Sequence, residues 1–358
     1  MKARHILTAA LLLASASTQA QDKRPLPPPL VTDTPMVHDP VMAQEGGTYY
    51  LFSTGNHIQV MTSTDRRRWT LRRGGALGTI PAWTRDSVPG FRSHVWAPDV
   101  LRWHGRWWMA YSCSTFGKNT SAIGLARCAS LSAFHWDDMG CLVSSRKDDN
   151  FNAIDPCFAV DDDDRVWLAF GSFWDGIQLV RLTTVSEDLR QYGSWMRGTD
   201  ERLVVDSTFQ RITLARRYHH NAPEGLQNPT SRYAGVNAIE APFIFRHDGW
   251  YYLLVSWDYC CRGEKSNYRV VVGRSRNVSG PYLDREGRDM AQGGGTLVAQ
   301  GDKRAFEAMG HCAVYTFGGD DVFVCHGYSV PLKGASILVQ RRLRWDADGW
   351  FTLEQEDR

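Results

Sequence analysis

One pattern of polar and hydrophobic residues recurs five times along the chain. A polar or glycine-containing turn is followed by paired or near-paired aromatic residues and an apolar run, and a second run rich in β-branched residues comes next. Such runs between turn residues are typical of β-hairpins. The first runs, with their turns, are 46–52, 104–110, 163–169, 248–254 and 319–324, and the second runs are 58–62, 123–128, 177–182, 270–275 and 337–340.

Repeated hairpins of this kind predict stacked β-units around an axis, because a single hairpin cannot bury its own faces. We therefore predict an all-β, five-bladed β-propeller. The expected boundaries are a signal peptide at 1–20, a lead-in segment at 21–33 and the propeller domain at 34–357. One domain can have this length, since each interface between blades forms its own small core.

The first twenty residues have the composition of a secretory signal peptide. Lys2 and Arg4 precede an apolar stretch at 6–16, and small residues end at Ala20. This stretch is shorter than the roughly 20 residues of a membrane-spanning helix, so we expect no membrane anchor. We expect an exported protein, periplasmic or extracellular. We also expect it to be a monomer. Removing these two basic residues from 41 leaves 39 Lys and Arg against 39 Asp and Glu, which gives no electrostatic reason to bind nucleic acid.

Eight cysteines in an exported chain suggest disulfides. Adjacent Cys260 and Cys261 are expected to point to opposite faces of a strand and therefore to have no common partner. Two other pairs could be bridged across hairpins or could be free. These pairs are Cys312 with Cys325 and Cys113 with Cys128.

An acidic residue or histidine stands ten or eleven positions before the aromatic run in four of the five repeats, and Trp96 lies in the equivalent stretch of the second. Residues 152–155 and 237–240 have nearly the same sequence, Asn-Ala-Ile-Asp and Asn-Ala-Ile-Glu, which supports a common register. The first strand of each blade lines the central channel, so equivalent residues should form a ring. The predicted ring contains Asp39, Trp96, Asp155, Glu240 and His311.

Three carboxylates and an aromatic ring at one end of a channel suit hydrolysis of a glycosidic bond. One acid protonates the leaving oxygen, a second carboxylate activates water or attacks the anomeric carbon, and the aromatic face stacks on the sugar. A third carboxylate raises the pKa of the acid. Asp39 or Asp155 alone could be a structural Asp-Pro turn. Glu240 differs, because burying an acid inside an apolar strand costs free energy, and this favours a functional role for it.

The motifs around these residues resemble those of glycoside hydrolase family 43, and the resemblance spans about residues 34–354. Cys-Cys-Arg-Gly at 260–263 and Ser-Phe-Trp-Asp-Gly-Ile at 172–177 resemble the endo-acting α-1,5-L-arabinanases most. The other matching strings are Val-His-Asp-Pro at 37–40, Val-Trp-Ala-Pro-Asp at 95–99, Ala-Ile-Asp-Pro at 153–156, Ala-Ile-Glu-Ala-Pro at 238–242 and Gly-His at 310–311.

The resemblance implies Asp39 as general base, Glu240 as general acid and Asp155 as the residue that tunes the acid and orients the sugar. It also implies inversion of configuration, for which the acid and base carboxyls stand roughly 6.5 to 9.5 Å apart. No organic cofactor is implied. His311 would reach toward an axial calcium ion whose other ligands are largely water. Calcium prefers oxygen donors, so His311 could equally be a buried core histidine.

The resemblance also assigns contacts to the sugar. Trp96 and Phe116 match aromatic subsite positions, although stacking on sugar competes there with packing in the protein. Asn152 could equally be a turn residue. The implied polar contacts to arabinose hydroxyls are His38, Asn152, Ser172 and Asp175.

We therefore predict an exported hydrolase that cleaves internal α-1,5-linked L-arabinofuranosidic bonds of arabinan, as in pectic side chains. An exo-acting arabinofuranosidase or xylosidase of the same family would keep the three carboxylates and close the groove into a pocket. A sugar-binding propeller without catalysis is the alternative from another functional class. The insertion at 201–236, which contains His219 and His220, is expected to be a surface loop.

Overall fold

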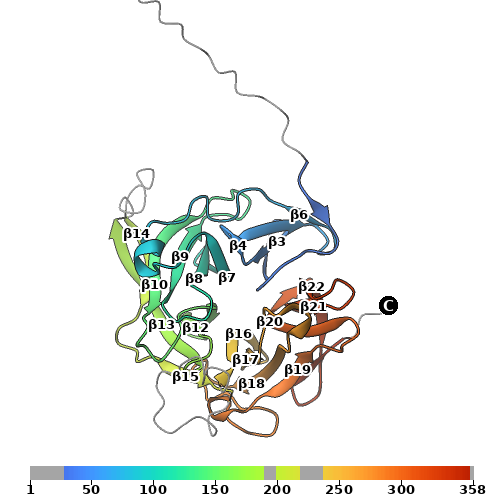
Figure 1. The fold of residues 1–358 in the computed structure, drawn as a ribbon. Coiled ribbons are helices and arrows are strands. Elements are labelled where there is room, and N and C mark those ends of the chain that lie inside the picture. Colours follow the sequence, from blue (N-terminus) through green and yellow to red (C-terminus); the bar gives the residue numbers. More distant parts are fainter. Residues whose placement is uncertain (1–27, 189–198, 218–236, 355–358) are drawn as a thin grey trace, which may run out of the picture.

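The computed structural model describes residues 28–188, 199–217 and 237–354 of the chain. The predicted signal peptide, His219 and His220 lie outside these residues. Five antiparallel sheets are arranged around a central axis, and the strand numbering runs from blade to blade around the ring (Figure 1). The prediction of a five-bladed β-propeller is confirmed. No helix in the described residues is long and apolar enough to cross a membrane.

The blades follow each other in sequence order. Blade one contains β2 (Val41–Glu45), β3 (Thr48–Ser53), β5 (Gln59–Ser63) and β6 (Trp69–Leu71), with β1 (Val31–Thr32) on its outer edge. Blade two contains β7 (His94–Trp103), β8 (Arg106–Cys113), β9 (Ser121–Cys128) and β10 (Asp137–Ser145), with β4 (Gly55–Asn56) beside β7. Blade three contains β11 (Cys157–Val160), β12 (Val166–Phe170), β13 (Ile177–Asp188), β14 (Thr199–Val205) and β15 (Ile212–Ala215).

Blade four contains β16 (Ile239–His247), β17 (Trp250–Trp257), β18 (Arg269–Ser275) and β19 (Thr296–Gln300). Blade five contains β20 (Phe306–Phe317), β21 (Asp320–Ser329), β22 (Ala335–Trp345) and β23 (Phe351–Leu353). The short helix α1 (Trp83–Ser87) and the 3-10 turns η3 (Gly263–Lys265) and η4 (Met290–Gln292) lie in connections. The insertion expected to be a loop therefore supplies strands to blade three, since β14 and β15 both pair with β13.

Aromatic side chains of the repeated runs join neighbouring blades. Tyr49 on β3 meets Phe317 on β20 with ring centroids 5.2 Å apart, and Tyr252 on β17 meets Trp345 on β22 at the same distance. The ring is closed by backbone hydrogen bonds between residues 35–37 and 336–338. Burial between blades therefore explains why the aromatic pairs recur in the sequence.

The antiparallel order places two sets of loops at one end of the propeller. The segment before the first strand of each blade and the connection between its second and third strands lie at the same end, because the two inner strands run in opposite directions. All predicted site residues except His311, which lies within β20, are in these segments or in the first residues of the strand that follows. The connections are 54–58, 114–120, 171–176, 258–268 and 330–334.

Of the two alternatives left open for the hairpin cysteines, the structure has the unbridged one: all four cysteines of these pairs are free and buried. Cys113 pairs with Ala122 and Cys128 pairs with Trp107, so the two thiols lie at opposite ends of one ladder. A register shift between Gly310 and Ala313 interrupts the other hairpin where Cys312 lies. The expectation for Cys260 and Cys261 is wrong: they lie beyond the end of β17 and are bonded to each other.

Candidate active site

One residue of each blade has left-handed backbone at the active-site end of the first strand. These residues are Asp39 (φ 53°), Ala97 (φ 41°), Asp155 (φ 57°), Ala241 (φ 55°) and His311 (φ 49°). They occupy equivalent positions, and in blades one, two, four and five each lies six residues before the last paired residue of its strand. The predicted ring is thus correct for three members, whereas Trp96 and Glu240 stand one residue earlier than the true ring positions.

Side chains from the preceding blade hold this left-handed backbone in place. The hydroxyls of Thr54, Ser112 and Ser256 accept the backbone N–H of the ring residue in the next blade. These bonds are 2.8 to 3.0 Å long, and they satisfy amide groups that the irregular backbone takes out of the sheet ladder. The hydroxyl residues were missed in the sequence, although each follows or ends the second strand of its blade.

Asp39 is held by three neighbours. His311 Nδ1–H donates to Asp39 Oδ1 at 3.0 Å, and the Thr54 hydroxyl donates to Oδ2. The backbone N–H of Asp39 donates to His326 Nδ1 at 3.1 Å. Burial alone would raise the pKa of Asp39, but the charge and hydrogen bond of His311 hold it well below its usual range. Asp39 is therefore a charged carboxylate throughout the physiological pH range.

Glu240 is buried, and both of its carboxyl oxygens have hydroxyl partners. Tyr268 donates to Oε1 at 2.6 Å and Ser172 donates to Oε2 at 2.7 Å. Burial raises the pKa of Glu240, and these two hydrogen bonds only partly oppose the shift. Glu240 therefore keeps its proton to higher pH than an ordinary glutamate, and the cause is mainly desolvation.

Asp155 is bonded to the backbone beside Glu240. Its backbone N–H donates to Ser112, and its Oδ2 accepts the N–H of Ala241, the residue next to Glu240, at 3.2 Å. Burial raises the pKa of Asp155, the charge of His311 opposes this, and the charges of Glu240 and Asp39 add to the rise. Asp155 thus holds the backbone at Ala241, next to Glu240, in place.

His311 lies at the centre of the cluster. Burial lowers its pKa, but the charges of Asp39, Asp155 and Glu240, with the hydrogen bond to Asp39, raise it to about 9. The pKa of this one histidine is therefore raised by all three carboxylates. Residues 39, 155 and 240 are thus brought together from three different blades. These residues are far apart in the sequence, and only the repeated hairpin pattern indicates that they lie close together.

A group of three residues beside the carboxylates could hold a metal ion. His38, Asp39 and His326 present ligand atoms within 4.8 Å of one another and could hold a metal. His326 Nδ1, however, already accepts the Asp39 N–H. Calcium prefers six to eight oxygen donors, and this group offers one carboxylate and two imidazoles. This group therefore does not fit a calcium site built from protein oxygens alone, and calcium at His311 stays a prediction.

The predicted aromatic and polar contacts have different surroundings. Phe116 is 76 % exposed in the connection between β8 and β9, whereas Trp96 is half-buried and its indole N–H donates to His94 at 3.2 Å. Asn152 is buried and accepts from Ser121 at 2.7 Å. Phe116 is thus available to a ligand, while Asn152 has at least one structural bond.

The remaining polar residues have firm protein partners. Ser172 is bonded to Glu240, and the carboxyl oxygens of Asp175 accept from Thr213 and Arg216, both at 2.8 Å. His38 packs against His326 with ring centroids 4.6 Å apart, and burial lowers its pKa. His38 is therefore neutral at pH 7 and has one face against the protein.

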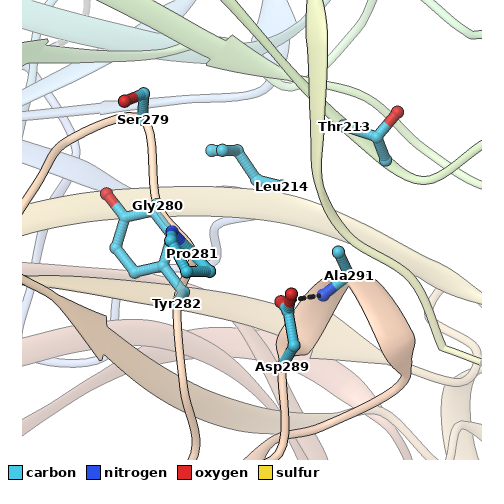
Figure 2. A pocket seen from close by; sticks show the side chains of 8 residues that line it. All are labelled: Thr213, Leu214, Ser279, Gly280, Pro281, Tyr282, Asp289 and Ala291. Atoms are coloured by element: carbon cyan, nitrogen blue, oxygen red, sulfur yellow. Dashed lines mark hydrogen bonds between the residues drawn. The ribbon is translucent and has the colours of Figure 1, made fainter.

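A separate hollow of about 190 Å³ lies between β15 and the 279–291 segment (Figure 2). The Asp289 carboxylate there accepts the backbone N–H of Ala291, as the dashed line shows. None of the predicted site residues lines this hollow. The paired carboxylates, rather than this hollow, are the better candidate for a chemical site.

The carboxylate cluster can carry out acid and base chemistry at the same pH. The charge of His311 lowers the pKa of Asp39, and burial raises the pKa of Glu240. Two titratable groups whose surroundings drive their pKa values apart are typical of a general base and a general acid. Hydrolysis across a bond placed between them is the reaction that this arrangement suits.

Comparison with known proteins gives a consistent result. The model of the glycosyl hydrolases family 43 matches residues 33–351. An extracellular exo-α-(1→5)-L-arabinofuranosidase of Cellvibrio japonicus is 40% identical over 329 residues, covering 90% of this chain and 87% of the relative. An extracellular endo-α-(1→5)-L-arabinanase of Bacillus subtilis is 34% identical over 320 residues, covering 88% and 87%.

A solved structure agrees with the sequence relatives. The crystal structure of an exo-1,5-α-L-arabinanase from a bovine ruminal metagenomic library superposes with a TM-score of 0.77 at 45% identity, covering 90% of this chain and 98% of that one. The family match spans all five blades and every residue of the carboxylate cluster. The chain belongs to glycosyl hydrolase family 43.

Proposed function

We propose that this protein hydrolyses α-1,5-linked L-arabinan by a single displacement, with Glu240 as general acid and Asp39 as general base. The observation that carries the proposal is the opposite pKa shift of two carboxyls in one cluster: the charge of His311 lowers the pKa of Asp39, and burial raises the pKa of Glu240. Arabinan is proposed as substrate because the relatives at 40% and 34% identity are described as acting on α-(1→5)-L-arabinofuranosyl bonds.

Glu240 would protonate the oxygen of the leaving sugar. Its carboxyl is fixed by Tyr268 and Ser172, so the proton is presented in one orientation. After transfer, the same hydroxyls stabilise the carboxylate that forms, because hydrogen bonds to a charged acceptor are stronger than those to a neutral one.

Asp39 would take a proton from water as that water attacks the anomeric carbon. The His311 cation keeps Asp39 ionised, and the Thr54 hydroxyl and the N–H bond to His326 fix the orientation of its carboxylate. Asp155 would act as positioning residue, since its Oδ2 anchors the backbone next to Glu240. Attack by water on the face opposite the leaving group inverts the configuration.

The position of cleavage along the polymer has two candidates. The sequence motifs favour attack on internal bonds, and this stays a prediction. Release from a chain end is the second candidate, because the relative at 40% identity and the solved structure at 45% identity are both described as exo-acting. Export is proposed from the composition of residues 1–20 together with the extracellular description of both relatives.

Product analysis tests the proposal. Purified protein is incubated with debranched linear arabinan and with xylan, with Glu240→Gln as the variant and Tyr282→Phe as a control, since the Tyr282 hydroxyl donates to the Val278 carbonyl away from the acid. Mixed oligo-arabinosides at early times support internal cleavage, and short products of one size from the start support release from a chain end. The absence of cleavage of arabinan by the wild-type protein contradicts the proposed function.

A further inference from the structure

The connection between β17 and β18, residues 258–268, carries a disulfide between the adjacent residues Cys260 and Cys261. Among the described cysteines it is the one bonded pair. The connection lies at the active-site end of the propeller, in the same blade as Glu240. Nothing in the acid and base chemistry uses this disulfide, so its position calls for a separate explanation.

The disulfide rests directly on two tyrosines of the active site. Cys260 packs with Tyr268 and Tyr328, and Tyr268 is the residue that donates to Glu240. The N–H of Cys261 donates to the Tyr328 hydroxyl at 2.7 Å, and that hydroxyl lies 4.0 Å from the Cys261 sulfur. The disulfide is therefore one side chain away from the proposed acid.

Tyr328 connects the disulfide to the base side of the site as well. Its ring lies edge-on to His38 and His326, with centroids 5.7 and 5.3 Å apart, and His326 holds the backbone of Asp39. Burial raises the pKa of Tyr328, and the nearby charges of Asp39 and Glu240 raise it further. Tyr328 thus lies between the disulfide and the histidines beside Asp39.

The loop is well fixed around the disulfide. Arg269 donates to Asp258 at 2.8 Å, and Ser266 accepts the N–H of Arg262 at 3.1 Å. A side chain at Gly334 would come within 2.3 Å of the Glu264 nitrogen, so the neighbouring 330–334 connection packs closely on this loop. These contacts therefore hold the loop in one conformation.

The exposed disulfide is uncharged and apolar, and the exposed charged residues Arg262, Glu264 and Lys265 follow it in the same loop. Cys261 is exposed to solvent and Cys260 is partly exposed. A disulfide carries no hydrogen-bond donor, in contrast to the carboxylates, hydroxyls and imidazoles around it. An apolar surface beside polar catalytic groups suits the C–H face of a sugar, while the hydroxyls on the other faces reach polar side chains.

We propose that the Cys260–Cys261 disulfide is a rigid contact surface for an arabinofuranosyl unit bound beside Glu240. This inference rests on the proposed function. The bond between neighbouring residues fixes the two sulfur atoms as one apolar surface. Cys260 packs against the cluster that contains Tyr268 and Tyr328. The disulfide is a specificity-determining element that acts on substrate binding and takes no part in proton transfer.

Protection from reduction tests the contact without changing the loop. Glu240→Gln protein is treated with a phosphine reductant and an alkylating agent, with and without arabinohexaose, and alkylation of Cys260 and Cys261 is followed by mass spectrometry. With arabinohexaose at ten times its dissociation constant, about one eleventh of the protein is free, so reduction should slow about tenfold. An unchanged rate, with binding verified by calorimetry, overturns the inference.

A variant gives an independent readout. The double variant Cys260→Ser, Cys261→Ser should raise KM for arabino-oligosaccharides by about three- to tenfold and leave kcat within about twofold, because the lost contact is made equally in ground and transition states. Cys141→Ser, a free and partly buried cysteine on β10, is the matched control and should keep both constants. A fall in kcat with constant KM contradicts a binding role.

The two proposals fail in distinguishable ways. Wild-type protein that does not cleave arabinan refutes the proposed function, and the assignment of the disulfide falls with it. Wild-type protein that cleaves arabinan while the disulfide remains unprotected by bound arabinohexaose refutes the assignment alone.

Discussion

Removing the Tyr268 hydroxyl should move the alkaline limit of activity upward. Tyr268 donates to Glu240 Oε1 at 2.6 Å in a buried environment, and this bond opposes the rise in the Glu240 pKa that burial causes. Tyr268→Phe removes one oxygen and keeps the ring, so packing against Cys260 and Ala308 is retained. The variant therefore isolates the effect of the hydrogen bond on the acid.

The size of the shift follows from the strength of the bond. A hydrogen bond to a charged group contributes about 1.5 to 3 kcal/mol, and the neutral acid keeps part of it. A difference of about 1.4 kcal/mol between the two protonation states corresponds to one pKa unit. Because the bond favours the carboxylate, its loss raises the pKa of Glu240, and the alkaline limb of kcat/KM should move up by about one pH unit.

The assay is kcat/KM on an arabino-oligosaccharide across the pH range, with thermal unfolding measured in parallel. Tyr282→Phe is the matched control, since the Tyr282 hydroxyl is buried and donates to the Val278 carbonyl at 2.8 Å, away from the acid. Its alkaline limb should coincide with that of the wild-type protein. An unchanged or lowered limb in Tyr268→Phe would refute the assignment of Glu240 as the protonated acid.

Three further predictions concern other parts of the molecule. Burial raises the pKa of Asp99 to about 7, opposed by N–H donors such as Phe158, so the folded state binds its proton more tightly than the unfolded state. Stability should therefore fall as pH rises from about 4 to 7, by on the order of 1 kcal/mol per unit, and chemical denaturation of Asp99→Asn should show a flatter profile; an equal slope contradicts this. Phe116→Ala should leave the melting temperature unchanged, because the ring is 76 % exposed, and raise KM for arabinan about three- to tenfold through loss of stacking; unchanged kinetics exclude a subsite role. Chelator treatment should lower the melting temperature by no more than a few degrees, since the group of His38, Asp39 and His326 offers calcium one carboxylate and two imidazoles; a large loss would show a calcium site that this group does not account for.

The sequence predicts the propeller because each blade repeats the same hairpin. It places Asp39, Asp155 and His311 correctly, since their spacing to the following strand is set by one strand geometry. Glu240 stands eleven residues before Tyr251, as Asp155 stands eleven before Val166, but five residues separate Val160 from Val166 and only two separate His247 from Trp250. The count of ten residues that holds between Asp39 and Tyr49, where the turn is also two residues long, gives the true position at Ala241.

The partners of the site residues are harder to predict. Tyr268 reaches Glu240 from 28 residues away, and His326 reaches Asp39 from 287 residues away. The hydroxyls of Thr54, Ser112 and Ser256 do recur at strand ends, so this signal is present in the sequence. His326 takes the equivalent role for Asp39 without a hydroxyl, and the disulfide of Cys260 and Cys261 requires a left-handed backbone (φ 62° at Cys261) that the strand pattern does not indicate.

The most direct test of the mechanism is the configuration of the first product. Proton NMR of an arabino-oligosaccharide digest, recorded in the first minutes before mutarotation, reports the anomer that the enzyme releases. If Asp39 activates water for a single displacement, the new reducing end is the β-anomer. An initial α-anomer would mean that a carboxylate attacks the sugar directly, and it would contradict the roles proposed for Asp39 and Glu240.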